Sequence, residues 1–328
     1  MAWNPQVLPT CVLGDPMQAI FGFRGNALVN WQTDVEAYFP SAGALQTPWR
    51  WQRAGTPALG QWLLGVRAQL QAGQSVDLQT APPEVQWVHL QAATADAQRR
   101  QAAMVRSNGG QDSVLVIGDS RRPASRNNFA SQTPGTTVVE RVDLPELTQF
   151  ARTFDPTAAD PLTVLVEFAA SVMTGVGPAQ LLNRVRVLRF GRPQVPPSPI
   201  EAAAVAFANS PSMLEAQRFL ITLSREPQTR VYRPELLNAC QAALQTSQGS
   251  PAGLYAAALQ IRERQRHTGR TQSRRRVGST LLLKGLEADV AVILEPEEMT
   301  AQHLYVAMTR GARQLIVCSP TNILTPAR

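Results

Sequence analysis

Lysine is almost absent from this chain. Among 328 residues only Lys284 is a lysine, so arginine supplies the rest of the 31 Lys and Arg side chains. A phosphate loop of the form Gly-x-x-x-x-Gly-Lys-Ser/Thr needs a lysine after its last glycine. Lys284 stands between Leu283 and Gly285 instead, so the sequence excludes such a loop. A GC-rich genome also favours arginine over lysine, and the arginines by themselves therefore indicate little about function.

Cysteines and long apolar runs are scarce as well. The three cysteines, Cys11, Cys240 and Cys318, lie far apart and lack the spacing of metal ligands. We expect reduced, mostly buried thiols, as in a cytoplasmic protein. No stretch has the ~18 uncharged apolar residues of a membrane span. The N-terminus has no basic segment followed by an apolar run, so nothing indicates a secretory signal.

The composition is that of a globular protein with a basic surplus. Hydrophobic residues make up 44% of the chain, which is ample for packed interiors, and the length favours two domains. The formal net charge of +7 fits a polyanionic partner without identifying it.

The most informative stretch runs from Gly278 to Leu294. Lys284 and Glu287 stand there between two apolar runs, 281–283 and 290–294, which predict buried strands. Arg310 follows on a predicted helix. A lysine, a glutamate and an arginine at one edge of an α/β sheet indicate a site for a phosphate-bearing ligand. A buried strand followed by a solvated turn is the alternative.

A second unusual segment, Gly14-Asp-Pro-Met-Gln-Ala-Ile-Phe-Gly-Phe-Arg-Gly25, follows a predicted strand over residues 8–13. Phe21 and Phe23 flank a glycine, and Arg24 comes next. Aromatic rings beside an arginine can stack nucleobases, at about 1–3 kcal/mol per base. The alternative is that both rings belong to the core.

Four segments together resemble motifs of superfamily 1 DNA helicases of the UvrD/Rep type. Residues 14–25 are similar to the third motif, Leu45-Gln-Thr-Pro-Trp-Arg-Trp51 to the fourth, 278–294 to the fifth, and Leu304-Tyr-Val-Ala-Met-Thr-Arg-Gly-Ala-Arg313 to the sixth. They occur in the family's order over nearly the whole chain.

The resemblance implies roles toward ATP for five residues. Gln18 would sense the terminal phosphate, Arg50 would contact the γ-phosphate, and Arg310 would be the arginine finger. Trp49 would pack on the adenine, and Glu287 would accept hydrogen bonds from the ribose hydroxyls. Arginines suit a multidentate phosphate, and an arginine finger changes rates by orders of magnitude.

The resemblance also implies that Phe21, Phe23 and Arg24 contact single-stranded DNA. Two positions depart from the family pattern. Leu281 stands where relatives carry a histidine, which puts one polar DNA or coupling contact in doubt. Phe21 lacks the hydroxyl of the tyrosine often found there, which should leave stacking intact.

The expected fold class is α/β: a RecA-like parallel sheet flanked by helices, the second helicase motor domain, with an all-helical insertion. We expect a remnant of a first RecA-like domain over residues 1–40. The second RecA-like domain would occupy 41–145 and 271–328, around a helical insertion over 146–270.

Local patterns predict several elements directly. A helix should begin at Thr56-Pro57, strands should cover 85–90, 113–117 and 314–318, and a polar loop should cover 119–128. In the insertion, three Ser-Pro pairs at 198, 210 and 250 predict helix starts, and apolar faces over 162–173 and 213–223 predict helices. Seven arginines within 262–276 favour a nucleic-acid backbone, with a solvated tail as the alternative.

The resemblance implies the C-terminal motor half of an ATP-dependent DNA helicase or translocase that acts on single-stranded DNA. The phosphate loop is excluded, and the chain starts too close to Gly14 to hold the Asp-Glu strand that binds magnesium in the family. ATP with Mg²⁺ would therefore need an upstream segment or partner chain that carries the first RecA-like domain. Without it we expect no ATPase activity, and residues 1–40 either poorly anchored or docked on the rest of the chain or on another chain. The alternative is a non-enzymatic DNA- or protein-binding relative.

Overall fold

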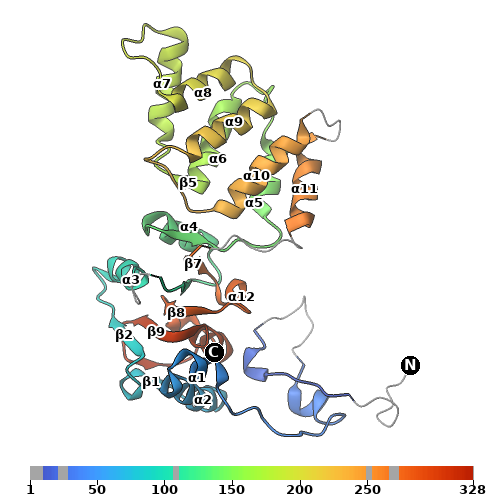
Figure 1. Ribbon diagram of the computed structural model, residues 1–328, viewed down its shortest axis with the longest axis vertical. Coiled ribbons are helices and arrows are strands. Elements are labelled where there is room, and N and C mark those ends of the chain that lie inside the picture. The colour runs from blue at the N-terminus through green and yellow to red at the C-terminus, as the bar shows by residue number, and fades with distance from the viewer. Residues whose placement is uncertain (1–9, 21–28, 106–110, 249–252, 266–272, 328) are drawn as a thin grey trace. The chain divides into compact units, whose positions relative to one another are not determined.

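The computed structural model describes residues 10–20, 29–105, 111–248, 253–265 and 273–327. The chain divides into two compact units (Figure 1). Unit 1 comprises Met1–Arg122 and Gly278–Arg328, and unit 2 comprises Pro123–Val277. Within the described ranges no helix combines the length and the apolarity that crossing a bilayer requires.

A six-stranded parallel sheet with flanking helices confirms the predicted α/β class and is consistent with a RecA-like fold. The strands run in the order β2-β9-β8-β3-β7-β4, and all pairs with a described register are parallel. Their bounds are β2 Val85–His89, β3 Val114–Ile117, β4 Thr136–Val138, β7 Arg275–Gly278, β8 Ala288–Ile293 and β9 Gly311–Ser319. The predicted strands at 85–90, 113–117, 290–294 and 314–318 are all among them.

The central strands of unit 1 are continuous apolar runs because helices cover both faces of a parallel sheet. Every residue of β3 is buried, and β3 pairs with β8 from Val114↔Val290 to Ile117↔Ile293. Strand β8 pairs with β9, with a shift of register after the pair Ala288↔Gly311. Glu287 and Arg310, the residues just before β8 and β9, therefore meet at one edge of the sheet.

The helices of unit 1 include α1 and α2, which are joined by a left-handed Gly55 with φ of 78°. Helix α2 begins at Thr56-Pro57 as predicted, and it buries Leu59, Leu63 and Val66. Besides the sheet strands, the described elements of unit 1 are the helices α1 Trp49–Ala54, α2 Pro57–Gln71, α3 Ala95–Ala103, α12 Thr280–Leu283 and α13 Ala301–Met308, the short turns η1 Pro16–Gln18, η2 Trp31–Val35, η3 Leu78–Thr80 and η5 Pro296–Glu298, and the antiparallel pair β1 Val76–Asp77 with β10 Ile323–Leu324.

Unit 2 is mostly helical. Its core contains a group of phenylalanines in ring contact. Phe150 stacks on Phe154 with ring centroids 4.9 Å apart, and it packs at a tilt against Phe168 with centroids 4.3 Å apart. The predicted apolar faces at 162–173 and 213–223 correspond to α6 and α9. Its described elements, besides β4 and β7, are α4 Pro123–Gln132, α5 Pro145–Thr153, α6 Pro161–Val172, α7 Pro178–Phe190, α8 Pro199–Asn209, α9 Met213–Ser224, α10 Pro234–Ser247, α11 Gly253–Gln265 and the pair β5 Met173–Thr174 with β6 Arg230–Val231.

The serine-based helix starts are partly confirmed. Ser198 caps α8, and its hydroxyl and the Glu201 side chain form a reciprocal capping box. The predicted start at Ser210 is wrong, because Ser210 ends α8 and Ser212 caps α9 through the backbone N–H of Glu215. Ser212 is followed by a glutamate at the third helical position, as Ser198 is, whereas Ser210 is not. The Ser250-Pro251 pair lies outside the described residues.

Three other local predictions are wrong in part. Residues 281–283 form the helical turn α12 rather than a strand, because the Ser279 hydroxyl accepts the Leu282 N–H at 3.3 Å and caps it. Of the strand expected at 8–13, residues 10–13 are described and irregular, and Leu13 is exposed. The polar loop ends at Arg122, where α4 follows. Short apolar or polar runs do not by themselves determine the element type.

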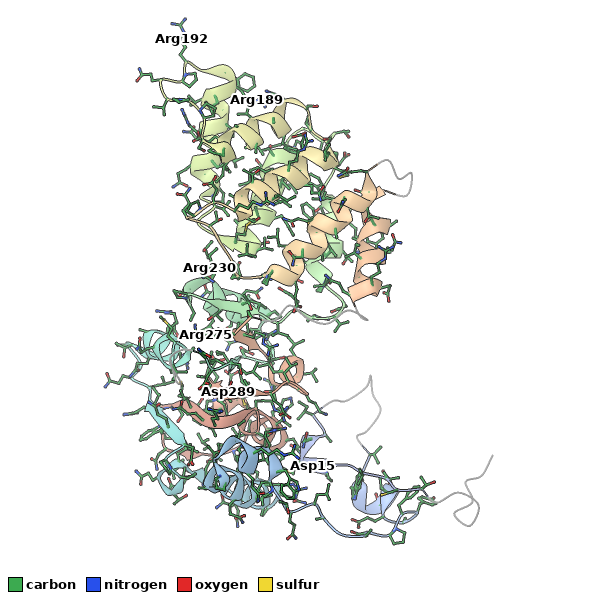
Figure 2. The ribbon with its side chains drawn as sticks, in the orientation of Figure 1. Asp15, Arg189, Arg192, Arg230, Arg275 and Asp289 are labelled. Carbon is green, nitrogen blue, oxygen red and sulfur yellow. The ribbon has the colours of Figure 1, made fainter. Side chains whose placement is uncertain are left out.

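The N-terminal residues that the structure describes are anchored in part. Turn η1 packs against α13 and buries Met17, and Ile20, two residues after the turn, is buried as well. Asp15, labelled in Figure 2, caps the turn through the Met17 N–H and forms an ion pair with Arg67 of α2 at 2.9 Å. Of the two alternatives for residues 1–40, docking on the rest of the chain therefore applies to residues 15–20.

A buried ion pair in unit 2 joins Arg233, the residue before α10, to Glu140, which follows β4. The Arg233 guanidinium donates to both oxygens of Glu140, at 2.6 and 2.8 Å, and to Glu146 at 2.9 Å. Burial lowers the pKa of Arg233, but the hydrogen bonds and charge of Glu140 outweigh this and raise it above its ordinary value. The side chains of Arg233 and Glu140 are each 5% exposed, whereas that of Glu146 is 42% exposed.

We predict that Glu140→Ala destabilises unit 2 by about 3–5 kcal/mol, because it leaves a buried guanidinium with one partial partner. Glu146→Ala, the matched control, should cost less than about 1 kcal/mol because its pair is solvated. Denaturant unfolding followed by far-UV circular dichroism measures the change. All six tryptophans lie at or before position 87, in unit 1, so tryptophan fluorescence follows that unit separately. Equal effects of the two variants would contradict the prediction.

Candidate functional site

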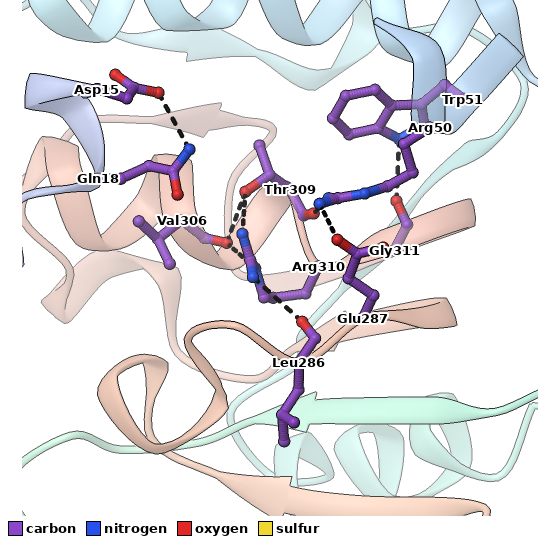
Figure 3. A network of polar contacts seen from close by, with 10 residues as sticks. All are labelled: Asp15, Gln18, Arg50, Trp51, Leu286, Glu287, Val306, Thr309, Arg310 and Gly311. Carbon is purple, nitrogen blue, oxygen red and sulfur yellow. Dashed lines mark hydrogen bonds and ion pairs between the residues drawn. The ribbon is translucent and has the colours of Figure 1, made fainter. Parts of the chain in front are cut away.

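Side chains of α1 and of the start of α2 donate hydrogen bonds to backbone carbonyls between the end of α13 and the first residues of β9 (Figure 3). The Arg50 guanidinium donates to the Thr309 carbonyl at 2.5 Å, and the Trp51 indole N–H donates to the Gly311 carbonyl at 3.0 Å. The Thr56 hydroxyl, at the start of α2, donates to the carbonyl of Ala312 at 2.7 Å. These contacts bring the predicted fourth motif onto the predicted sixth.

Arg310 lies at the centre of this arrangement and is only 4% exposed. Its guanidinium donates to the carbonyls of Val306 at 2.9 Å and Leu286 at 3.1 Å, and to the Thr309 hydroxyl at 3.0 Å. The acceptors that the described residues provide for it are thus all neutral. Burial lowers the pKa of Arg310, and the charge of nearby Arg50 lowers it further. Among the described residues Arg310 therefore has no hydrogen bond to a carboxylate, although the nearby charge of Glu287 acts to raise its pKa.

Arg50 and Glu287 form an ion pair between Nη2 and Oε1. The Glu287 side chain is 54% exposed, so this pair lies at the surface, whereas Arg310 is buried. The Arg50 guanidinium also lies over the Trp51 ring, 5.1 Å from its centroid. Two of the residues predicted to contact nucleotide thus contact each other.

Trp49 opens α1 and presents its side chain to solvent, with 62% of the residue exposed. The position of α1 depends on Gly60 of α2, since a Cβ there would lie 2.9 Å from the Cβ atoms of Pro48 and Trp51. An exposed indole on the residue directly before Arg50 is a flat apolar face one position along the helix from a guanidinium. Such a face suits a planar ring that carries an anionic group.

Gln18 is adjacent to this network but does not belong to it. Within the described residues its amide donates to Asp15 at 3.1 Å, and it has no hydrogen bond to Arg50, Glu287 or Arg310 (Figure 3). The backbone carbonyl of Gln18 accepts a hydrogen bond from the Lys284 ammonium at 2.8 Å. Lys284 therefore joins the predicted third motif to the fifth, a role that the sequence reasoning missed.

The structure thus brings Arg50, Glu287 and Arg310 into one cluster. Trp49 precedes Arg50 on α1 with an exposed side chain, and Gln18 contacts Asp15 and Lys284 instead of the cluster within the described residues. Thr309 was also missed, although its place directly before Arg310 in Met-Thr-Arg-Gly was a usable signal. The predicted DNA contacts Phe21, Phe23 and Arg24 lie outside the described residues. Their roles stay predictions.

No family model matches the chain, and no curated protein matches it. The roles of the clustered residues consequently rest on their geometry and on the motif resemblance.

The chemistry of the cluster favours an anion. Arg50 and Arg310 provide two positive charges near one carboxylate, Glu287, and a guanidinium offers several donors in a fixed fork. Glu287 can accept hydrogen bonds from a diol. In the part of the chain that the structure describes, no group of three or more His, Cys, Asp or Glu side chains is arranged to hold a metal ion. Two guanidinium groups beside one carboxylate therefore suit an anionic ligand that also offers hydrogen-bond donors.

We predict that Glu287→Gln raises the affinity for inorganic tripolyphosphate about three- to fivefold, because it removes the ion pair that occupies Arg50. Isothermal titration calorimetry at low ionic strength measures this affinity. Glu298→Gln is the matched control, because Glu298 is also 54% exposed and is paired with an arginine, Arg122, away from the cluster. Equal affinities in both variants would show that Arg50 takes no part in anion binding.

Proposed function

We propose that this chain is the C-terminal motor half of an ATP-dependent DNA helicase or translocase that acts on single-stranded DNA. The observation that carries the proposal is the buried Arg310 guanidinium, which within the described residues is held by neutral acceptors and lies near the charges of Arg50 and Glu287. A buried charge of this kind favours an anionic partner. The same residues are those that the motif resemblance assigns to ATP.

Each residue would contact a different part of the nucleotide. Trp49 would pack on the adenine, and Glu287 would accept hydrogen bonds from the ribose hydroxyls. Arg50 and Arg310 would donate to the phosphates, with Arg310 stabilising the charge that develops on the transferring group. A guanidinium has five N–H donors, and Arg310 uses three of them within the described residues. Two therefore remain for a phosphate.

ATP turnover would need a second segment. The sequence holds no phosphate loop, and the described side chains form no group that would bind Mg²⁺. We therefore propose that an upstream segment or a partner chain supplies the phosphate loop and the magnesium-binding carboxylates, completing the cleft. When bound, Mg²⁺ would neutralise phosphate charge.

Single-stranded DNA would be bound through Phe21, Phe23 and Arg24, next to turn η1. A cytoplasmic location is part of the same proposal. The described thiols of Cys11, Cys240 and Cys318 are unpaired, which agrees with a reducing compartment.

We predict that the isolated chain binds a fluorescent ATP analogue and that two substitutions weaken this binding. Trp49→Ala should weaken it roughly tenfold through lost stacking. Arg310→Ala should weaken it by more than about tenfold through lost hydrogen bonds to charged phosphate. Arg53→Ala, an exposed arginine on the same helix α1, controls for the loss of one positive charge and should change the affinity less than about twofold.

Two results would contradict different parts of the proposal. Binding that is equally insensitive to all three substitutions would place the nucleotide elsewhere or nowhere. ATP hydrolysis by the isolated chain that Arg310→Ala abolishes would show that no second segment is needed.

We predict further that Phe23→Ala lowers the affinity for a single-stranded oligonucleotide about tenfold, because one base loses its stacking partner. Fluorescence anisotropy at constant salt measures the affinity. Tyr38→Ala provides the control, because Tyr38 is an exposed aromatic residue in the same N-terminal segment. An unchanged affinity in Phe23→Ala would assign Phe23 to the core.

A further inference from the structure

One residue, Thr309, contacts both arginines of the cluster. Its hydroxyl accepts Nη2–H of Arg310 at 3.0 Å, while its backbone carbonyl accepts Nη1–H of Arg50 at 2.5 Å (Figure 3). Thr309 is buried and follows the last residue of α13. A single peptide unit with its side chain therefore sets the separation of two guanidinium groups that repel each other.

The direction of the Thr309 hydroxyl is fixed by a second bond. Its proton is donated to the Val306 carbonyl at 2.9 Å, which leaves its lone pairs for Arg310. The same carbonyl accepts Nε–H of Arg310 at 2.9 Å. Arg310, Thr309 and Val306 thus form a closed ring of hydrogen bonds, in which loss of the hydroxyl would leave the buried Nη2 of Arg310 with one partner fewer.

The ring fixes the plane of the guanidinium. The Leu286 carbonyl binds Nη1 of Arg310 at 3.1 Å from the strand side, and the Thr309 hydroxyl binds Nη2 from the helix side. With Nε, Nη1 and Nη2 each bound once, the side chain has a single orientation. A fork of donors that is oriented in advance binds phosphate without a further loss of side-chain freedom.

We propose that Thr309 is the positioning residue of the anion site: its hydroxyl orients Arg310, and its carbonyl holds Arg50 at a fixed distance from it. The proposal rests on the proposed function for the identity of the anion, but the orientation of Arg310 can be measured without any ligand. The substitution that isolates the role is Thr309→Val, which keeps the shape and removes the hydroxyl. Thr309→Ser keeps the hydroxyl and removes the methyl group, and Thr309→Ala removes both.

The first measurement is the rate at which phenylglyoxal modifies individual arginines of the full chain, read by peptide mass spectrometry. Arg310 should be modified about tenfold faster in Thr309→Val and Thr309→Ala than in the wild type, and at the wild-type rate in Thr309→Ser. Arg233, which is as buried as Arg310 at 4% exposure, is the internal control for general loosening. Its rate should stay the same in every variant.

The second measurement is the affinity for inorganic tripolyphosphate, which should fall about tenfold in Thr309→Val and Thr309→Ala and be restored in Thr309→Ser. Unchanged Arg310 modification, or equal acceleration at Arg233, would overturn the positioning role. A wild-type affinity in Thr309→Val despite faster modification of Arg310 would overturn it too. If Arg310 alone is released while even the wild type binds neither tripolyphosphate nor nucleotide, the hydroxyl still orients Arg310 and the proposed function fails instead.

Discussion

The structure of unit 1 depends on how the end of α13 accommodates a buried guanidinium. Removing a charge from water costs several kcal/mol unless polar groups replace the solvent. Here the carbonyl of Val306, in the last turn of α13, provides part of that replacement, and a helix C-terminus carries partial negative charge. The Leu286 carbonyl, just before β8, provides more. Burial of Arg310 thus requires the helix end and the start of β8 to lie where they do.

The same short connection also holds α1. The carbonyls of Thr309, Gly311 and Ala312 accept hydrogen bonds from the side chains of Arg50, Trp51 and Thr56. Gly311 permits this arrangement because a Cβ there would lie 2.4 Å from the Gln314 carbonyl oxygen and 2.9 Å from the Ala291 nitrogen. A larger residue would displace β9 and with it every acceptor of α1. The position of α1 therefore depends on backbone geometry 260 residues away in sequence.

The sequence predicts the elements better than it predicts their contacts. Long apolar runs predicted β3, β8 and β9. Segments with apolar residues at helical spacing predicted α2, α6 and α9. The run 281–283 was misassigned because three apolar residues fit a strand or a helical turn equally well, and the Ser279 cap decides for the turn. Motif order selected Arg50, Glu287 and Arg310 correctly as neighbours. It contains no information on which of them pair, because that depends on side-chain directions across the folded sheet edge.

The pairing distinguishes the two arginines. Within the described residues the acceptors of Arg310 are neutral, so an anion can approach it without displacing a carboxylate from them. Arg50 is paired with Glu287, so an anion that reaches Arg50 leaves Glu287 without its partner. A ligand that offers only phosphate bears that cost, whereas one that also offers a diol gives Glu287 new donors in exchange. Under the proposed function, the Arg50–Glu287 pair would therefore favour nucleoside polyphosphates over inorganic ones without any contact to the base.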